Sequence, residues 1–272
     1  MAFLHAVSSG TSATKSVLKG KSLTPYLLLA PGLIWLVTFF IIPIFSLAST
    51  STMVRPDGAQ VGVYEQKLRF ANYVDAFICP SKFHYQKFKE FGFLNQKLHQ
   101  IYHSYQSKEI EEIANNKIEK TERFVLFVGR LEKIKGVQTL LNAMLNCNNI
   151  KLKIAGYGTE ENNLKAFVNE HELENVHFLG KRNRKEVLEL LAQAEFLICP
   201  SEWYEVLGFT IVEAMMMKKP VIGANIGAIP ETVIHNKTGL LFNMGDSDML
   251  STQINTLYQN QQLISKLGEN AF

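Results

Sequence analysis

Cysteine is scarce in this chain of 272 residues. Its three cysteines, Cys79, Cys147 and Cys199, stand far apart, and no two of them form a Cys-x-x-Cys pair. An odd number of widely spaced cysteines argues against a disulfide framework and against a structural zinc site, and suits a reducing compartment. The simplest interpretation of each is a buried free thiol that packs as a small apolar side chain.

A large excess of either charge is also missing. The net charge is +3 at pH 7, which is too small to indicate a nucleic-acid partner, and no basic face alternates with aromatic residues as a base-stacking surface would. We therefore expect no nucleic-acid binding. The composition, 47% hydrophobic and 19% charged, is typical of a folded protein, and the length allows one large or two modest domains.

No charged residue occurs between Lys21 and Arg55. Inside this stretch, residues 26–48 read YLLLAPGLIWLVTFFIIPIFSLA, which is long enough for the roughly 20 apolar residues of a spanning helix. Lysines but no acids precede the run, and this bias predicts an N-terminus in the cytosol. We therefore expect a transmembrane helix over 25–50, membrane contact through 26–48, and a single-pass membrane protein.

Two other interpretations of the apolar run stay open. A cleaved signal peptide would use Ser46-x-Ala48 as its small-residue cleavage site, although the long basic lead and the long apolar core are less typical of such peptides. A helix buried on all sides in a protein core would be equally apolar. The spanning helix is the interpretation that best fits the length of the run.

The same region resembles a transport protein. The residues TPYLLLAPGLIWLVTFFIIPIFSLA, followed by RFANYVDAF, are similar over about residues 20–77 to the start of an ABC-transporter inner-membrane permease of the polyamine type. In that family the first spanning helix leads into an outside loop. The other permease helices and the loop that couples to the ATPase are absent, so we do not expect transport by this chain alone.

After residue 120, short apolar runs alternate with stretches of helical period. The expected strands are 124–128, 151–155, 176–179, 196–199 and 220–223, and the expected helices are 137–145, 160–171, 184–194, 210–217 and 246–258. This alternation predicts an α/β fold in which helices cover both faces of a parallel, Rossmann-like sheet. Ligands bind such sheets beyond the carboxyl ends of the strands, where Gly129, Gly156 and Gly180 allow a close approach of the backbone.

Two cations follow the first expected strand in the segment GRLEKIKG, residues 129–136. Arg130 offers a forked guanidinium and Lys135 a compact ammonium, and both groups suit a diphosphate. Solvated charges at a helix start are the alternative interpretation. That alternative is less favourable, because cations are disfavoured near a helix N-terminus unless an anion is bound there.

Two acids, Glu205 and Glu213, are separated by seven residues in PSEWYEVLGFTIVEAM. Between them the chain enters a helix near residues 208–210, and the free amides of a helix N-terminus suit a phosphate. Glu213 can accept two hydroxyl hydrogen bonds from a ribose edge, and Glu205 can point at a sugar beyond the phosphates. Taken alone, both acids could also be surface residues favoured by the helix dipole.

Five segments together resemble one enzyme family. In order and at the usual spacing, GRLEKIKG, IAGYG, FLGKRNRKEV, PSEWYEVLGFTIVEAM and GAIPETVIHNKTGLLF are similar to retaining glycosyltransferases of the GT-B fold, family-4 type. The resemblance covers about residues 74–272. It implies the C-terminal, donor-binding half of a GT-B fold, which binds a nucleotide-diphosphate sugar for retaining hexosyl transfer.

The resemblance also implies roles for individual residues. Glu205 would contact the donor sugar as the catalytic residue, Glu213 would hold the ribose, and Arg130 with Lys135 would hold the diphosphate. Donor binding would involve Gly129, Arg130, Lys135, Gly156, Lys181, Arg182, Leu207, Gly208, Phe209, Thr210 and Glu213, with Lys181 and Arg182 beside the base and the amides of 207–210 at phosphate. No metal and no cofactor is expected, because the cations neutralise the departing diphosphate.

The chain departs from the family pattern in several places. Val206 stands where the family usually has glycine, Met217 stands where a small residue is usual, and Gly227-Ala228 replaces a double glycine. The larger departure is the missing N-terminal domain, which carries the acceptor site in this family. The predicted segments are a basic N-terminus (1–24), a transmembrane helix (25–50), a polar linker (51–73), a remnant of the N-terminal domain with a linker (74–106) and the nucleotide-sugar-binding domain (107–272).

Three functional hypotheses follow. The chain is the donor domain of an incomplete glycosyltransferase with an unidentified glycan or lipid-linked acceptor, a non-catalytic nucleotide-sugar-binding module, or a permease fragment. The resemblance predicts that the glycosyltransferase domain lies in the cytoplasm, whereas a single span with a cytosolic N-terminus would put that domain outside. This conflict favours a fusion of two genes.

Overall fold

The computed structural model describes residues 73–93, 95–105, 108–115 and 122–272. The chain divides into two units, Met1–Val74 and Asp75–Phe272. The first unit lies almost entirely outside the described residues, and so do, apart from Tyr73, the three segments predicted before residue 74. The fold described below is that of the second unit.

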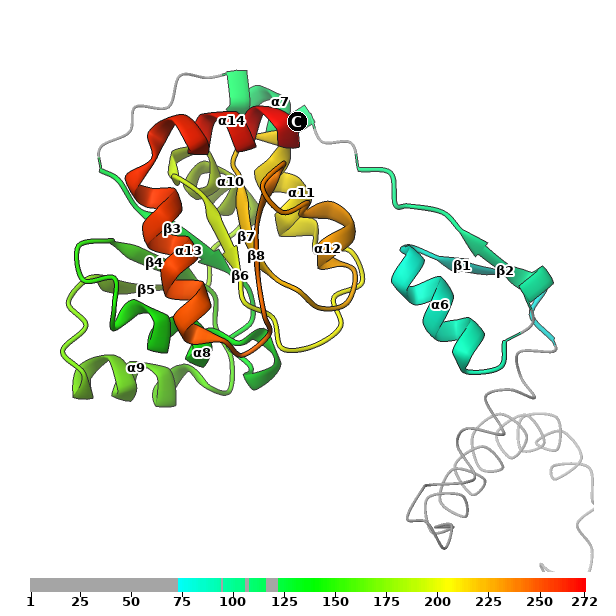
Figure 1. The fold of residues 1–272 in the computed structure, drawn as a ribbon, viewed down its shortest axis with the longest axis horizontal. Helices are drawn as coiled ribbons and strands as arrows, with labels where there is room; N and C mark the ends of the chain where they lie inside the picture. The colour runs from blue at the N-terminus through cyan, green and yellow to red at the C-terminus, as the bar shows by residue number, and fades with distance from the viewer. Residues whose placement is uncertain (1–72, 94, 106–107, 116–121) are drawn as a thin grey trace, which may run out of the picture. The chain divides into compact units, whose positions relative to one another are not determined.

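The second unit begins with a short strand–helix–strand segment (Figure 1). Strand β1 (Phe77–Cys79) pairs in parallel with β2 (Leu98–Gln100), and helix α6 (Lys82–Glu90) and the 3-10 turn η2 (Asn95–Lys97) lie between them in the chain. The side chain of Ser81 caps α6 by accepting a hydrogen bond from the amide of His84 at 3.1 Å, as expected for serine at a helix start. Helix α7 (Lys108–Asn115) follows.

The main domain is built on one six-stranded parallel sheet (Figure 1). The strands are β3 (Val125–Val128), β4 (Leu152–Ala155), β5 (Val176–Gly180), β6 (Leu197–Cys199), β7 (Val221–Ala224) and β8 (Gly239–Phe242). Their order across the sheet is β5-β4-β3-β6-β7-β8. The chain thus builds outward from β3 in one direction, then returns and builds outward from β6 in the other. A ligand crevice forms at such a reversal, outside the carboxyl ends of the two central strands.

Helices follow the strands and cover both faces of the sheet (Figure 1). They are the 3-10 turn η3 (Lys133–Lys135), α8 (Val137–Met144), α9 (Glu161–Glu170), α10 (Arg184–Gln193), α11 (Phe209–Met216), α12 (Ile229–Thr232), α13 (Ser247–Gln259) and α14 (Gln261–Ala271). One hydrophobic cluster takes residues from α8, α9, α13 and α14. The other takes residues from α7, α10, α11 and α12. The sheet therefore has a separate core on each face.

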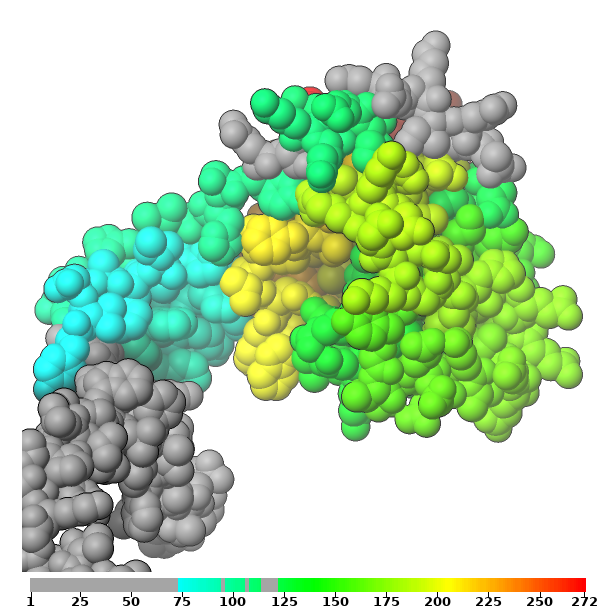
Figure 2. Space-filling view, turned by 180° about the vertical axis from the view of Figure 1, so that it is seen from behind, coloured from blue at the N-terminus to red at the C-terminus, as the bar shows by residue number. Residues whose placement is uncertain are grey.

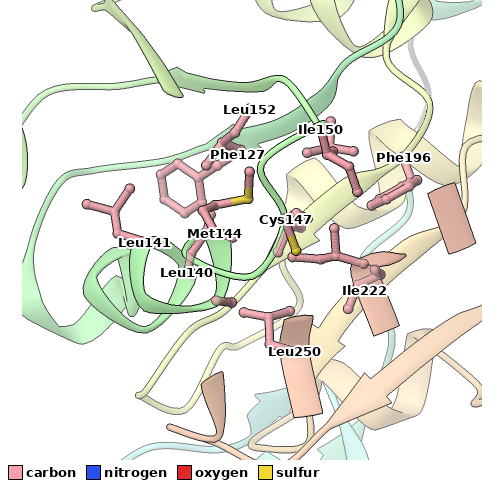
Figure 3. Close-up of a cluster of buried hydrophobic side chains, with 14 of the residues drawn as sticks. Phe127, Leu140, Leu141, Met144, Cys147, Ile150, Leu152, Phe196, Ile222 and Leu250 are labelled. Atoms are coloured by element: carbon pink, nitrogen blue, oxygen red, sulfur yellow. The ribbon is translucent and has the colours of Figure 1, made fainter. Parts of the chain in front are cut away.

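The strands supply both cores because alternate side chains point to opposite faces. In β3, Val125 and Phe127 belong to the first cluster, whereas Leu126 belongs to the second. Figure 3 shows the first cluster, where Leu140 and Leu141 of α8 pack near Phe127. A strand that is buried on both faces reads as a continuous apolar run, which is why these strands are recognisable from the sequence.

The predicted α/β fold with a parallel, Rossmann-like sheet is confirmed, and each of the five expected strands and five expected helices forms within one or two residues of its predicted bounds. The strand β8 and the helices α12 and α14 were not predicted. Residues 239–242 form only four residues of strand at one side of the sheet. Other strands of the sheet are equally short, so the reason lies in the sequence: β8 begins with glycine, which is depleted in strands, directly after the polar segment 235–238.

The prediction of a single-pass membrane protein is corrected. In the part of the chain that the structure describes, no helix is long and apolar enough to cross a membrane. The longest described helix, α13, has 13 residues, fewer than the roughly 20 that a span needs, because it covers one face of a small sheet. Residues 25–50, on which the prediction rested, lie outside the described residues. The resemblance of 20–77 to a permease, and the fusion inferred from it, gain no support and stay predictions.

The two leucines at the end of α8 test the packing of the first core. Leu141 is fully buried, whereas Leu145, just after the helix, is 38% exposed. In the full chain we expect Leu141→Ala to lower the free energy of unfolding by about 2–5 kcal/mol, because it removes buried methyl groups and leaves a cavity. Leu145→Ala should cost under about 1 kcal/mol. Urea unfolding followed by circular dichroism measures both; equal losses would contradict this description of the core.

Candidate functional site

The loops that follow β3 and β6 are joined into one surface at the point where the strand order reverses. The amide of Glu202 donates to the carbonyl of Ile134 at 2.9 Å, and the hydroxyl of Thr139 donates to the Glu202 carboxylate at 2.5 Å. Gly136 lies so close to Pro200 that an added Cβ would stand 1.9 Å from the Pro200 carbonyl oxygen. Segments more than sixty residues apart in the chain thus form a single edge.

An ion pair crosses this junction. The ammonium of Lys135 lies 2.5 Å from a carboxylate oxygen of Glu205, and the two side chains are only 23% and 18% exposed. The buried hydroxyl of Ser201 donates to the same oxygen of Glu205 at 2.6 Å. A partly buried carboxylate needs such partners, because its desolvation is otherwise unfavourable. The structure therefore brings together two residues that the sequence assigned to one site.

The backbone of Glu205 is held from the other side by the segment after β7. The amide of Ala228 donates to the Glu205 carbonyl at 3.2 Å. Gly227 has a φ of 61°, and an added Cβ there would stand 2.8 Å from the amide nitrogen of Glu205. This close approach gives a physical reason for glycine at the start of the GAIPE sequence.

Helix α11 begins directly after the Glu205 loop. Gly208, at φ 71°, precedes the helix, and no side chain caps this end. The first amides of an uncapped helix are donors without an intrahelical partner, and they carry the positive end of the helix dipole. The predicted phosphate-binding amides of Leu207, Gly208, Phe209 and Thr210 therefore lie at the same edge of the sheet as Glu205.

Glu213 lies one turn inside α11 and is 5% exposed. Its oxygen Oε1 accepts hydrogen bonds from the hydroxyl of Tyr105 and, at 2.8 Å, from Nη1 of Arg184. Burial and the bond to Glu213 raise the pKa of Tyr105, whereas the bonds to Tyr105 and Glu213 raise the pKa of Arg184. At neutral pH the phenol is therefore protonated and the guanidinium charged.

Sequence reasoning missed Arg184 and Tyr105 as partners of Glu213. Arg184 belongs to the basic run after β5, which from the sequence alone is equally a solvated loop. Tyr105 lies in the connection before α7, where no period or motif marks it. Both residues come from elements far from Glu213 in the chain, so no local pattern could have joined the three.

A pocket of about 240 Å³ opens at the ends of β3, β4 and β5. It is lined by Val128, Gly129, Arg130, Ala155, Gly156, Tyr157, Lys181, Arg182 and Val187. An added Cβ at Gly156 would stand 1.8 Å from the Gly129 carbonyl oxygen, so this strand end tolerates only glycine. The ammonium of Lys181 lies 5.2 Å from the centre of the Tyr157 ring. Gly129, Arg130, Gly156, Lys181 and Arg182, all predicted from the sequence, thus line one pocket.

The predicted site residues fall into three groups rather than one. The first lines the pocket, the second is the pair Lys135–Glu205 with the start of α11, and the third is the buried Glu213. Arg130 is 61% exposed and pairs with Glu132 at 2.7 Å, and in the described residues no ion pair or hydrogen bond joins it to Glu205. All three groups follow the carboxyl ends of parallel strands. In Figure 2 the yellow surface near residue 200 lies beside green surface, with a hollow between them.

Two further residues near this edge, the thiol Cys199 and the acid Asp246, could carry chemistry by their type alone. Burial raises the pKa of Cys199, at the end of β6, to about 11, so its thiol is protonated and a poor nucleophile at neutral pH. The sequence Asp246-Ser247-Asp248 has the Asp-x-Asp spacing of some metal-binding motifs, but its first acid caps a helix. Asp246 caps α13, accepting from the amide of Met249 at 2.8 Å. Within the described ranges no three His, Cys, Asp or Glu residues are grouped as a metal would require.

Two glycines test how the loops at the reversal point are joined. Gly136 and Gly180 both have left-handed backbones, with φ of 65° and 71°, but only Gly136 has a neighbour within 4 Å of an added Cβ. We expect Gly180→Ala to cost about 1–2 kcal/mol of backbone strain. Gly136→Ala should cost clearly more, because its methyl group meets the Pro200 carbonyl. Urea unfolding of both variants measures the difference; equal losses would argue against the close packing of the two loops.

Comparison with known proteins identifies the domain. Residues 108–272 match the family model for glycosyl transferases group 1. An uncharacterized glycosyltransferase of Methanocaldococcus jannaschii is 33% identical over 54% of this chain and 41% of its own length. The N-acetyl-alpha-D-glucosaminyl L-malate synthase of Bacillus anthracis is 32% identical over 57% of this chain and 41% of its own length.

The fold of this chain also matches a solved structure. The crystal structure of Anabaena HepE in complex with UDP-glucose is 26% identical, with a TM-score of 0.66, and the match covers 80% of this chain and 63% of that one. The match covers only 41% of the length of each of the two curated relatives named above. Since the family model covers well over half of the present chain, the chain belongs to the glycosyl transferases group 1 family.

Proposed function

We propose that residues 107–272 bind a nucleotide-diphosphate sugar as the donor-binding half of a retaining glycosyltransferase. The observation that carries the proposal is the Lys135–Glu205 pair at the reversal point of the sheet, beside the uncapped start of α11. Cation, carboxylate and free amides thus meet at the edge where parallel sheets bind ligands. The HepE structures, described as complexes with UDP and glucose and with UDP-glucose, support a donor of this class.

The proposed roles follow from the chemistry of each group. Lys135 and the amides from Leu207 to Thr210 take the diphosphate, and Arg130 reaches it from the neighbouring pocket. Without donor, Lys135 neutralises Glu205; a bound diphosphate competes for the ammonium and frees Glu205 to contact the sugar. Charge that develops on the leaving diphosphate is then stabilised by fixed donors. We expect no metal and no cofactor to be required.

The pocket at the ends of β3, β4 and β5 suits the base. The Tyr157 ring offers a flat apolar surface, whereas Lys181 and Arg182 line the same pocket with cationic groups. The absence of a side chain at Gly156 lets its backbone pack against the carbonyl of Gly129, which lines the same pocket. Glu213, buried on α11, is the proposed ribose acceptor.

Binding is the first test of this proposal. We expect calorimetry on the full chain to detect UDP or GDP, alone or as the sugar conjugate. Lys135→Met and Arg130→Met should each weaken binding about tenfold or more, because each removes a charge-assisted hydrogen bond to phosphate. Lys133→Met, an exposed neighbour on η3, is the matched control and should change affinity less than about twofold. Equal affinity in all four proteins would count against the site.

Turnover separates a donor-binding half from a working enzyme. The described residues outside 107–272 supply two short strands and one helix, 73–105, and we propose that they do not form an acceptor site. We therefore expect binding of the nucleotide sugar with transfer and hydrolysis near zero, measured as release of UDP or GDP with and without EDTA. Robust release would show that the chain carries a complete active site, and loss of release in EDTA would show that a metal takes part.

A further inference from the structure

The buried carboxylate of Glu213 is held by a closed set of contacts. Its side chain is 6% exposed, and so deeply buried a carboxyl group needs hydrogen-bond partners that compensate for its lost hydration. Nη1 of Arg184 reaches Oε1 at 2.8 Å, the Tyr105 hydroxyl donates to the same Oε1, and Nη2 of Arg184 lies 2.6 Å from the Tyr105 hydroxyl oxygen. The three groups therefore form a hydrogen-bonded ring.

The ring is anchored on three separate elements. Arg184 begins α10, whose start is fixed by a capping box between Asn183 and Glu186. The Nε of Arg184 also contacts Glu109 of α7 at 2.9 Å. The ring of Tyr105 lies 5.7 Å from that of Phe209, the first residue of α11. Because contacts with α7, α10 and α11 hold these side chains, the geometry around Glu213 is set by the fold before any ligand arrives.

The hydrogen bonds described for Glu213 all fall on one of its two oxygens. Oε1 accepts from both Tyr105 and Arg184. A carboxylate has about four lone-pair positions on its two oxygens. Fixing Oε1 therefore fixes the plane of the group, and Oε2 keeps its capacity to accept hydrogen bonds in a defined direction.

From this geometry we propose that Arg184 and Tyr105 are positioning residues for Glu213, which orient its carboxylate so that Oε2 can accept hydrogen bonds from the ribose hydroxyls of the donor. The inference rests on the proposed function, because it concerns the same site. A carboxylate that is oriented in advance loses little rotational freedom on binding, so the ribose contact becomes selective. A nucleotide without those hydroxyls would leave the carboxylate unpaired.

The test compares a ribonucleotide with its 2′,3′-dideoxy counterpart, using UDP or GDP according to which the wild type binds. We expect the wild-type chain to prefer the ribonucleotide about tenfold or more. Arg184→Lys and Tyr105→Phe should reduce that preference below about threefold, while affinity for the dideoxynucleotide stays within twofold of wild type. Tyr105→Phe keeps the ring beside Phe209, so it decides the matter if Arg184→Lys fails to fold. Lys185→Met, an exposed neighbour on α10, should keep the full preference.

The outcomes are distinguishable. If the wild type binds no nucleotide, the proposed function itself fails. If the wild type binds and prefers the ribonucleotide but both variants keep that preference, the positioning role is overturned and the proposed function stands. If the variants lose affinity for both nucleotides equally, Arg184 and Tyr105 act only through the stability of the fold, and the inference is again overturned.

Discussion

The contact between the loops after β3 and β6 is the constraint on which the proposed site depends. Gly136 meets the Pro200 carbonyl, the Glu202 amide bonds to Ile134, and Lys135 pairs with Glu205. The central strands of a parallel sheet end at the same edge, and the reversal of strand order opens a space between the loops that follow them. Without a side chain at Gly136 the two loops meet closely enough for a cation and a carboxylate to be paired across that space.

Charge at this edge is balanced in the absence of a ligand. Glu205 is compensated by Lys135 and Glu213 by Arg184, and both acids receive a further hydroxyl donor, from Ser201 and Tyr105 respectively. Partly or fully buried carboxylates are stable only with such partners. The two pairs differ in what a donor would do to them. In the proposed function, a diphosphate would compete with Glu205 for Lys135, whereas a neutral ribose would add hydrogen bonds to Glu213 and leave Arg184 in place.

Much of the fold was predictable because its signals are local. Val125, Leu126 and Phe127 face two cores in succession, so the strand is a continuous apolar run, and helices between such runs imply a parallel sheet. The edge strand at Gly239 gave no such signal. The apolar run at 26–48 was an equally local signal, but it lies outside the described residues. Among the described helices none is long and apolar enough to cross a membrane.

The sequence by itself determined the class of fold, the family, and the residue types placed at the strand ends: Arg130, Lys135, Glu205 and Glu213 all come from short, ordered segments. Only the tertiary structure decided how these residues are grouped. It put Arg130 in a pocket with Lys181, paired Lys135 with Glu205, and surrounded Glu213 with Arg184 and Tyr105. The reason is physical: a side chain's type is written at one position, whereas its partner is set by strand order and loop packing, which join residues distant in the chain.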